Sequence, residues 1–120
     1  MSESTTYEGG CHCGAVRFEV TMEAPSKAFD CNCSICSTAG WLLAFAPEEA
    51  FALIQGEGAL RDYQFGKKST HHLFCGTCGT RSFSRGAGPD GKVMVAVNLR
   101  CLRGLDATKL PTETFDGAAL

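Results

Sequence analysis

Seven of the eight cysteines in this 120-residue chain fall into three short clusters, and the eighth, Cys101, stands apart. The clustered residues are Cys11 and Cys13, then Cys31, Cys33 and Cys36, and then Cys75 and Cys78. Thiolate sulfurs bind Zn²⁺ in groups of four at structural sites, whereas catalytic zinc sites keep one position open for water or substrate. The residue type and the spacing therefore point to zinc chemistry.

Two of the clusters have the form of half a tetrahedral zinc site. Side chains at positions i and i+2 of an extended segment point to the same face, so Cys11 and Cys13 can direct two sulfurs at one ion. Cys75 and Cys78 form a C-x-x-C pair within a glycine-rich turn. Together the four thiolates would close one structural zinc site.

The middle cluster, Cys31, Cys33 and Cys36, supplies three thiolates and no obvious fourth ligand. A zinc ion with three protein ligands and one open position is the arrangement of a catalytic site. Spacing alone leaves a second pairing open, in which Cys31 and Cys33 join Cys75 and Cys78 and the first C-x-C pair stays idle. A purely structural role for all the clustered cysteines is open as well.

Two interpretations without a metal ion fit the sequence less well. A disulfide framework is typical of exported proteins, and a bridge within a C-x-C pair closes a strained ring. A redox dithiol at Cys75 and Cys78 would need a helix after the first cysteine, whereas residues 79–83 have the pattern of a strand. The cysteines therefore favour metal binding.

The histidines and the isolated cysteine are the other side chains that could join a site. His12 lies between two predicted ligands and is expected on the opposite face, at the surface. His71 and His72 are neighbours on a predicted strand, so at most one of them could serve as a fourth ligand or a proton shuttle. Partly exposed strand histidines are the simpler interpretation, and Cys101 is expected to act as a small buried hydrophobe.

Charge and hydropathy exclude several classes of function. Eleven Lys and Arg residues against thirteen Asp and Glu give a formal net charge of −2, which does not suit a protein that binds duplex DNA or an anionic membrane. The polar residues 1–6 give no secretory signal, and the apolar run at 41–47 is far shorter than the ~20 residues of a membrane-spanning helix. We therefore expect a cytoplasmic protein, whose reduced cysteines are free to bind metal.

The elements that must position these cysteines are predicted to be short strands. Residues 15–20 alternate, with Val16, Phe18 and Val20 on one face and Arg17 and Glu19 on the other. Further strands are predicted at residues 42–46, 52–55, 60–65, 71–74, 81–85 and 93–99, and a short helical turn at residues 47–51. Strands about 10–12 residues apart are typical of an antiparallel all-β protein.

The length leaves room for a single domain, residues 1–120, with one modest core. Metal sites are expected to add to the stability of such a core. Trp41, Phe74 and Phe83 are expected in the core or in a pocket wall, and Phe115 is expected to dock onto the core.

Taken in order, the segments at residues 10–18, 31–36 and 74–79 resemble the glutathione-dependent formaldehyde-activating enzyme (GFA) family. The centromere protein V branch of that family is the most similar, through residues 29–36, 63–65 and 70–75. The resemblance extends over residues 7–117. It implies an all-β zinc domain of several coiled antiparallel β-sheets, of the Mss-four-like type, with two zinc ions per chain.

The resemblance also implies roles for the cysteines. Those at 11, 13, 75 and 78 match the ligands of a structural zinc ion, and those at 31, 33 and 36 match the ligands of a catalytic one. The implied activity is that of a carbon–sulfur lyase or synthase, which adds glutathione to formaldehyde to give S-hydroxymethylglutathione. The implied partner is a small thiol such as glutathione, with neither nucleic acid nor membrane.

Three thiolates would leave the catalytic zinc site with a charge of −1, which favours delivery of a thiolate nucleophile over activation of water. The alternative function is a non-catalytic zinc-binding module for a protein or a small-thiol partner. A fourth ligand from His71, His72 or Cys101 would favour that alternative. The sequence leaves the oligomeric state open.

Overall fold

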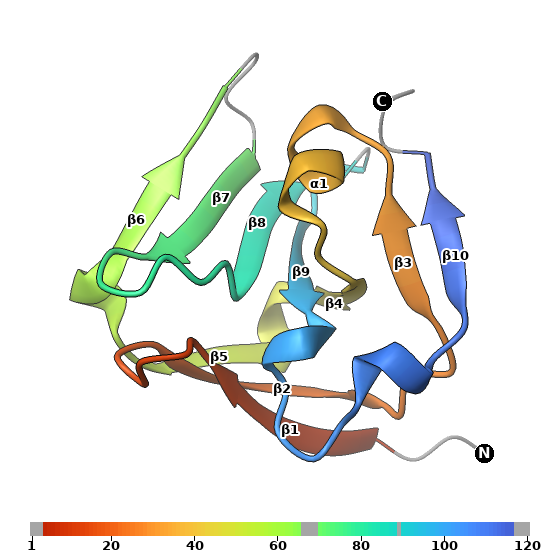
Figure 1. The fold of residues 1–120 in the computed structure, drawn as a ribbon, viewed down its shortest axis with the longest axis horizontal. Coiled ribbons are helices and arrows are strands. Elements are labelled where there is room, and N and C mark those ends of the chain that lie inside the picture. The colour runs from red at the N-terminus through yellow and green to blue at the C-terminus, as the bar shows by residue number, and fades with distance from the viewer. Residues whose placement is uncertain (1–3, 66–69, 89, 117–120) are drawn as a thin grey trace.

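The structure is a computed structural model that describes residues 4–65, 70–88 and 90–116 of the chain. Within these residues the protein is built mainly of β-strands, which form two sheets, together with one short α-helix (Figure 1). The all-β class predicted from the sequence is confirmed. The boundary predicted at residue 117 lies outside the described residues.

The smaller sheet has three antiparallel strands in the order β1-β2-β5. They are β1 (Ser4–Gly10), β2 (Arg17–Glu23) and β5 (Phe51–Gln55). Val16, Phe18 and Val20 are each at most 1% exposed, so the buried face predicted from their alternation is confirmed. The turn between β1 and β2 carries Cys11 and Cys13.

The larger sheet has seven strands in the order β10-β3-β4-β9-β8-β7-β6. They are β3 (Ala28–Cys31), β4 (Leu43–Pro47), β6 (Leu60–Tyr63), β7 (Thr70–Cys75), β8 (Phe83–Ala87), β9 (Val93–Asn98) and β10 (Thr112–Phe115). All neighbours are antiparallel except β10 and β3, which are parallel, so the expectation of purely antiparallel sheets is wrong at this pair. The reason is that residues 99–111 carry the chain back along the molecule, as a connection between strands of the same direction must.

Short helices occupy several of the connections. The α-helix α1 spans Ser34–Ala39, and the 3₁₀ helices are η1 (Glu48–Ala50), η2 (Glu57–Ala59), η3 (Leu99–Cys101) and η4 (Ala107–Lys109). The helical turn predicted at residues 47–51 is confirmed as η1, with Pro47 at its N-cap. All seven predicted strands are present, with ends displaced by at most three residues, whereas β1, β3, β10 and α1 lie outside the predicted elements.

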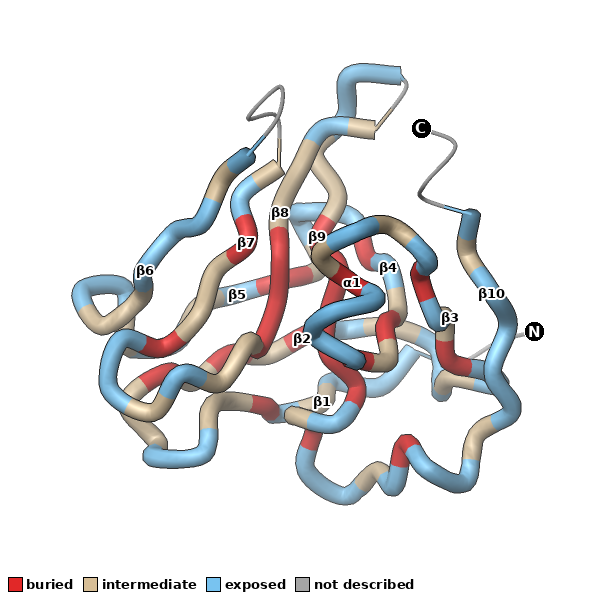
Figure 2. The backbone as a smooth tube through the Cα atoms, turned by 45° about the horizontal axis from the view of Figure 1, so that its top comes forward, coloured by how far each residue is buried: buried red, intermediate tan, exposed pale blue. Residues whose placement is uncertain are grey.

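The main core fills the space between the two sheets, and buried positions line β2, β8 and β9 (Figure 2). Phe83 is 1% exposed, and its ring centroid lies 4.6 Å from that of Phe51 and 5.9 Å from that of Phe18. Val95 and Val97 of β9 belong to this core. The expectation that Phe83 is a core residue is therefore confirmed.

A second, smaller core lies on the opposite face of the large sheet, because neighbouring residues of a strand point to opposite faces. Its buried members are Cys31, Cys36, Trp41, Leu43 and Ala96. Ala96 lies between Val95 and Val97 on β9 and therefore faces away from the main core. Helix α1 lies on this side of the sheet (Figure 1).

The remaining aromatic predictions have mixed outcomes. Trp41 is buried, and Phe115 packs against the second core, as expected. Phe74 is only partly buried, and the guanidinium of Arg81 lies 5.1 Å from the centre of its ring.

No helix of the described residues is long and apolar enough to cross a membrane.

Candidate metal centres

Four cysteines from two distant parts of the sequence come together in one cluster. Cys11 and Cys13 lie in the turn after β1, Cys75 ends β7, and Cys78 lies in the turn that follows it. Their four sulfurs are all within 4.8 Å of one another. The Sγ–Sγ distance is 3.6 Å between Cys11 and Cys13 and 3.7 Å between Cys13 and Cys75. A tetrahedron of sulfurs around zinc has edges of about 3.8 Å, so the cluster fits one zinc ion.

The backbone conformation that brings these sulfurs together differs from the one expected from the sequence. The first C-x-C pair is not on an extended segment, and its sulfurs converge because the chain turns there. His12 is exposed, as expected. Gly79, just after the second pair, has a φ of 79°, which glycine adopts without the strain of a side chain.

Backbone N–H groups are directed at the sulfurs of this four-cysteine cluster. The N–H of Val16 donates to the Cys11 sulfur at 3.3 Å, and the N–H of Thr77 donates to the Cys75 sulfur at 3.4 Å. The backbone N–H groups of Cys78 and Thr77 lower the pKa of Cys75. Such donors favour thiolates over thiols, which is the state that binds a metal ion.

The thiols of this four-cysteine cluster differ in pKa. The hydroxyl and the backbone N–H of Thr80 lower the pKa of Cys78 to about 5. The backbone N–H of Ala15 lowers the pKa of Cys13, but the neighbouring Cys11 thiol, burial and the other sulfurs outweigh it and raise that pKa to about 11. A bound dication would favour the thiolate form of all four cysteines, because its positive charge stabilises each negative sulfur.

The second cluster is formed by Cys31, Cys33 and Cys36, whose sulfurs also lie within 4.8 Å of one another. Cys31 ends β3, Cys33 is the N-cap residue of α1, and Cys36 lies within the helix. Cys31 and Cys36 are buried, and Cys33 is partly exposed. Helix α1, which the strand pattern did not predict, therefore positions two of the three sulfurs.

The three sulfurs of this cluster differ in how readily they ionise. Burial raises the pKa of Cys31 and of Cys36. Burial also acts to raise the pKa of Cys33, but the backbone N–H groups of Cys36 and Ile35 and the two neighbouring sulfurs lower it overall. The cause is its N-cap position, since the first N–H groups of a helix have no partner within the helix. Cys33 is therefore the most readily ionised of the three.

The two clusters correspond to the first of the two pairings left open by the sequence. Among the described residues, no other His, Cys, Asp or Glu joins the three-cysteine cluster as a fourth ligand group. All eight cysteines are free, so the structure contains no disulfide. Cys101, in η3, is partly buried outside both clusters, and its sulfur lies 3.9 Å from the carbonyl oxygen of Arg81.

The two strand histidines face opposite sides of β7, as predicted. His71 is exposed, and its Nδ1 lies 2.5 Å from Oδ2 of Asp62. His72 is only 7% exposed, so the expectation of partial exposure is wrong for this residue. Its Nδ1 lies 3.1 Å from the carbonyl oxygen of Tyr63, the ring of Phe65 stacks on it, and burial lowers its pKa.

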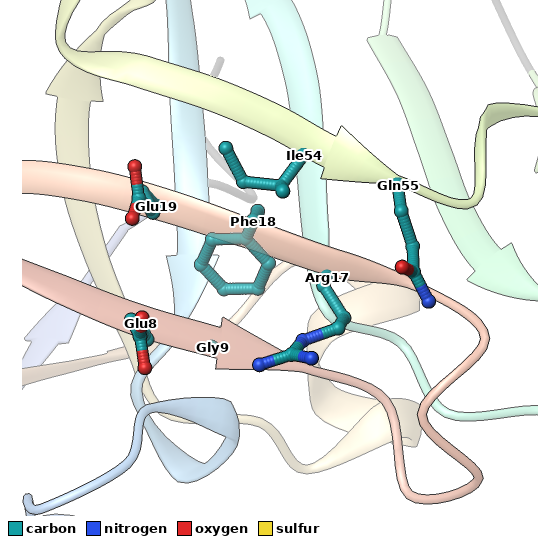
Figure 3. A pocket seen from close by; sticks show the side chains of 7 residues that line it. All are labelled: Glu8, Gly9, Arg17, Phe18, Glu19, Ile54 and Gln55. Atoms are coloured by element: carbon teal, nitrogen blue, oxygen red, sulfur yellow. The ribbon is translucent and has the colours of Figure 1, made fainter.

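Two cavities lie apart from the three-cysteine cluster. The first, of about 190 Å³, opens on the three-stranded sheet (Figure 3) and is lined by Glu8, Gly9, Arg17, Phe18, Glu19, Ile54 and Gln55. The second, of about 320 Å³, borders the four-cysteine cluster and is lined by Gly10, Cys11, His12, Thr80, Arg100, Cys101, Leu102 and Arg103. In Figure 3 two carboxylates lie at one end of the first cavity, and Arg17 and Gln55 lie at the other.

The fold and the clusters together define a small β protein with two groups of thiols, one of four and one of three, that could each hold a metal ion. The chain belongs to the glutathione-dependent formaldehyde-activating enzyme (GFA) family, which matches it over residues 6–115. The resemblance inferred from the cysteine segments is therefore confirmed.

Two known proteins are similar to this chain. A Halomonas elongata protein named "Putative glutathione-dependent formaldehyde-activating enzyme" is 59% identical over 34 residues, which is 28% of this chain and 22% of that protein. The match thus spans about a fifth of the length of that curated relative. The crystal structure of a Rhodobacter sphaeroides protein, solved as a structural genomics target, has a TM-score of 0.76 and 31% identity, covering 88% of this chain and 99% of its own.

Proposed function

We propose that this protein is a zinc-dependent enzyme of the carbon–sulfur lyase type that joins a thiol to an aldehyde. The proposed substrates are glutathione and formaldehyde, and the proposed product is S-hydroxymethylglutathione. The observation that supports this proposal most directly is the three-cysteine cluster, which has no fourth ligand group among the described residues. The family match supports the choice of thiol and aldehyde.

In this proposal Cys31, Cys33 and Cys36 hold a catalytic zinc ion. An all-sulfur donor set suits zinc, and the mutual distances of the sulfurs are compatible with a single ion. Zinc held there would supply positive charge that favours the thiolate form of a substrate thiol, whose unperturbed pKa is about 8.5.

The residues of the chain make the site asymmetric. Cys31 and Cys36 face the second core, so Trp41, Leu43 and Ala96 exclude water from that side. Cys33 is the partly exposed member of the cluster, so it marks the side on which a substrate can approach. In the overall reaction the S–H bond of the thiol and the π bond of the carbonyl group break, the substrate sulfur bonds to the carbonyl carbon, and the thiol proton ends on the oxygen. No oxidant or reductant is required.

The four-cysteine cluster is proposed to hold a structural zinc ion through Cys11, Cys13, Cys75 and Cys78. A closed four-thiolate site leaves no position for substrate, so its role is to join the β1–β2 turn to the turn after β7. Binding energies of about 10 kcal/mol or more are typical of structural zinc sites. Both sites need reduced thiols, which fits the proposed cytoplasmic location.

The decisive variant is Cys33→Ser, with Cys101→Ser as the matched control outside both clusters. The rate is measured by ¹³C exchange spectroscopy on labelled formaldehyde and glutathione, relative to the uncatalysed reaction. We expect the wild type and Cys101→Ser to accelerate the exchange and folded Cys33→Ser to lose the acceleration. Unchanged acceleration in folded Cys33→Ser would contradict the proposal. Zinc binding without acceleration in the wild type would favour a non-catalytic zinc module.

A further inference from the structure

Trp41 is the single tryptophan of the chain and has an unusual polar group. Its side chain is 3% exposed, and its indole Nε1 has no hydrogen-bond partner among the described residues. A buried N–H group without a partner is unfavourable, because it has lost its hydrogen bonds to water. Such a donor is therefore expected to have a partner in the functional state of the protein.

Trp41 is buried in the same small core as Cys36 of the three-cysteine cluster, and among the side chains of the buried members of that core only the sulfurs of Cys31 and Cys36 can accept a hydrogen bond from the indole N–H. The indole N–H acts to lower the pKa of Cys36, against the larger effect of burial. The two residues lie close together because of the turn that ends α1, where Gly40 has a φ of 70° and its N–H bonds to the carbonyl oxygen of Cys36 at 2.9 Å. This left-handed residue turns the chain back, so that Trp41 packs against the helix it follows.

We propose that Trp41 is a positioning residue of the three-cysteine metal site, whose indole N–H donates a hydrogen bond to the Cys36 sulfur when that sulfur binds the metal ion. This inference rests on the proposed function, since it requires a metal ion at the three-cysteine cluster. It adds a residue outside the cysteine set to the machinery of the site.

The physical role of such a bond follows from the charge of the site. Three thiolates and one Zn²⁺ carry a net charge of −1, and Cys36 is buried among apolar side chains that do not stabilise negative charge. A hydrogen bond to a charged acceptor is stronger than one between neutral groups, and low polarity strengthens it further. Partners of metal ligands commonly change metal affinity by about 10- to 100-fold when they are removed.

The test compares the wild type with Trp41→Phe, which keeps an aromatic ring and loses the N–H group. Each protein is first loaded with one equivalent of zinc, which is expected to fill the four-cysteine cluster, and is then titrated with Co²⁺. We expect Trp41→Phe to bind Co²⁺ at the three-cysteine cluster about 10-fold more weakly, with zinc at the four-cysteine cluster held equally tightly in both proteins.

Two spectroscopic signals separate a hydrogen bond from simple packing. Removing a donor raises the energy of the sulfur lone pair, so the sulfur-to-cobalt charge-transfer band of Trp41→Phe should move to longer wavelength. In the wild type, emission of Trp41 should stay constant during the first equivalent of metal and change with the second. A second variant carries the tryptophan analogue benzothienylalanine at position 41, in which sulfur replaces the N–H group with little change of shape.

The outcomes are distinct. Weaker Co²⁺ binding and a shifted band in both the Trp41→Phe protein and the analogue protein support the inference. Unchanged affinity and an unchanged band overturn it, and so does a loss of affinity in Trp41→Phe that the analogue protein does not share. A wild type that binds no second metal ion overturns the proposed function itself, and the inference falls with it.

Discussion

Replacing Cys75 by serine should remove a cross-link between two distant parts of the chain. Cys75 is 1% exposed, and its sulfur lies 3.7 Å from that of Cys13, which is 62 positions earlier. The proposed zinc ion, shared by the two residues, would close the intervening loop. Closing a loop of about 60 residues stabilises a folded protein by about 4 kcal/mol, chiefly through the lost entropy of the unfolded chain. Since small proteins have unfolding free energies of about 5–15 kcal/mol, the loss should be large.

The assay is urea unfolding in excess zinc. With an m-value of about 2 kcal/mol/M, a loss of about 4 kcal/mol lowers the midpoint by about 2 M urea. Cys101→Ser is the control, because Cys101 is a partly buried cysteine outside both clusters, and it should cost about 1 kcal/mol or less. Equal midpoints for the two variants would refute the reasoning, as would a wild-type midpoint that a chelator leaves unchanged.

Three further changes test the fold around the sites. Gly79→Ala should lower the free energy of unfolding by about 1–2 kcal/mol, because φ is 79° at this position. Gly58→Ala, at a position with no positive φ and with open space around its Cβ, should leave that free energy unchanged or raise it slightly. The urea midpoints of the two variants check this. Phe83→Ala should lower the free energy of unfolding by about 3–5 kcal/mol, measured by thermal or urea unfolding, and leave the metal content unchanged. The control is Phe45→Ala, at a position that is 37% exposed. A loss in Phe83→Ala no larger than the loss in Phe45→Ala would contradict the packing. Burial lowers the pKa of His72 in the folded state, so its contribution to stability is present above pH 6.5 and is lost as the pH falls below that value. Between pH 7.5 and 5.5 the wild type should therefore lose more unfolding free energy than His72→Gln, and equal slopes would contradict this.

The strands that the sequence predicts well are those with one face in the main core. In β2, alternation between buried and half-exposed residues is visible because the strand lies in the middle of its sheet. The missed strands β1 and β10 lie at sheet edges and are mostly exposed, so their residues show no apolar alternation. The residue of β1 that shows its packing against β2 is Gly9, since a Cβ at this position would lie 2.5 Å from Cζ of Phe18.

The sequence pattern does not predict helix α1, for a related reason. It is six residues long and buries only Cys36, so no helical repeat of apolar residues exists to be recognised. The available signal was Gly40, which ends the helix in the left-handed conformation. Without the helix, neither the N-cap position of Cys33 nor the burial of Trp41 in one core with Cys36 can be predicted.

Spacing was sufficient to divide the cysteines into short clusters, but it could not decide how distant clusters pair. The pairing depends on the β1–β2 turn lying beside the turn after β7, and that contact is a property of the two sheets together. The resemblance to the family implied the same grouping that the structure brings together. The role of these cysteines as metal ligands remains a prediction.

The two proposed zinc sites are tested most directly by the number of metal ions per chain in untagged protein purified without chelator, with a parallel titration of free thiols. We expect two zinc ions per chain, protection of the seven clustered cysteines, and reaction of Cys101 alone. One zinc ion per chain, with Cys31, Cys33 and Cys36 reacting as free thiols, would contradict it.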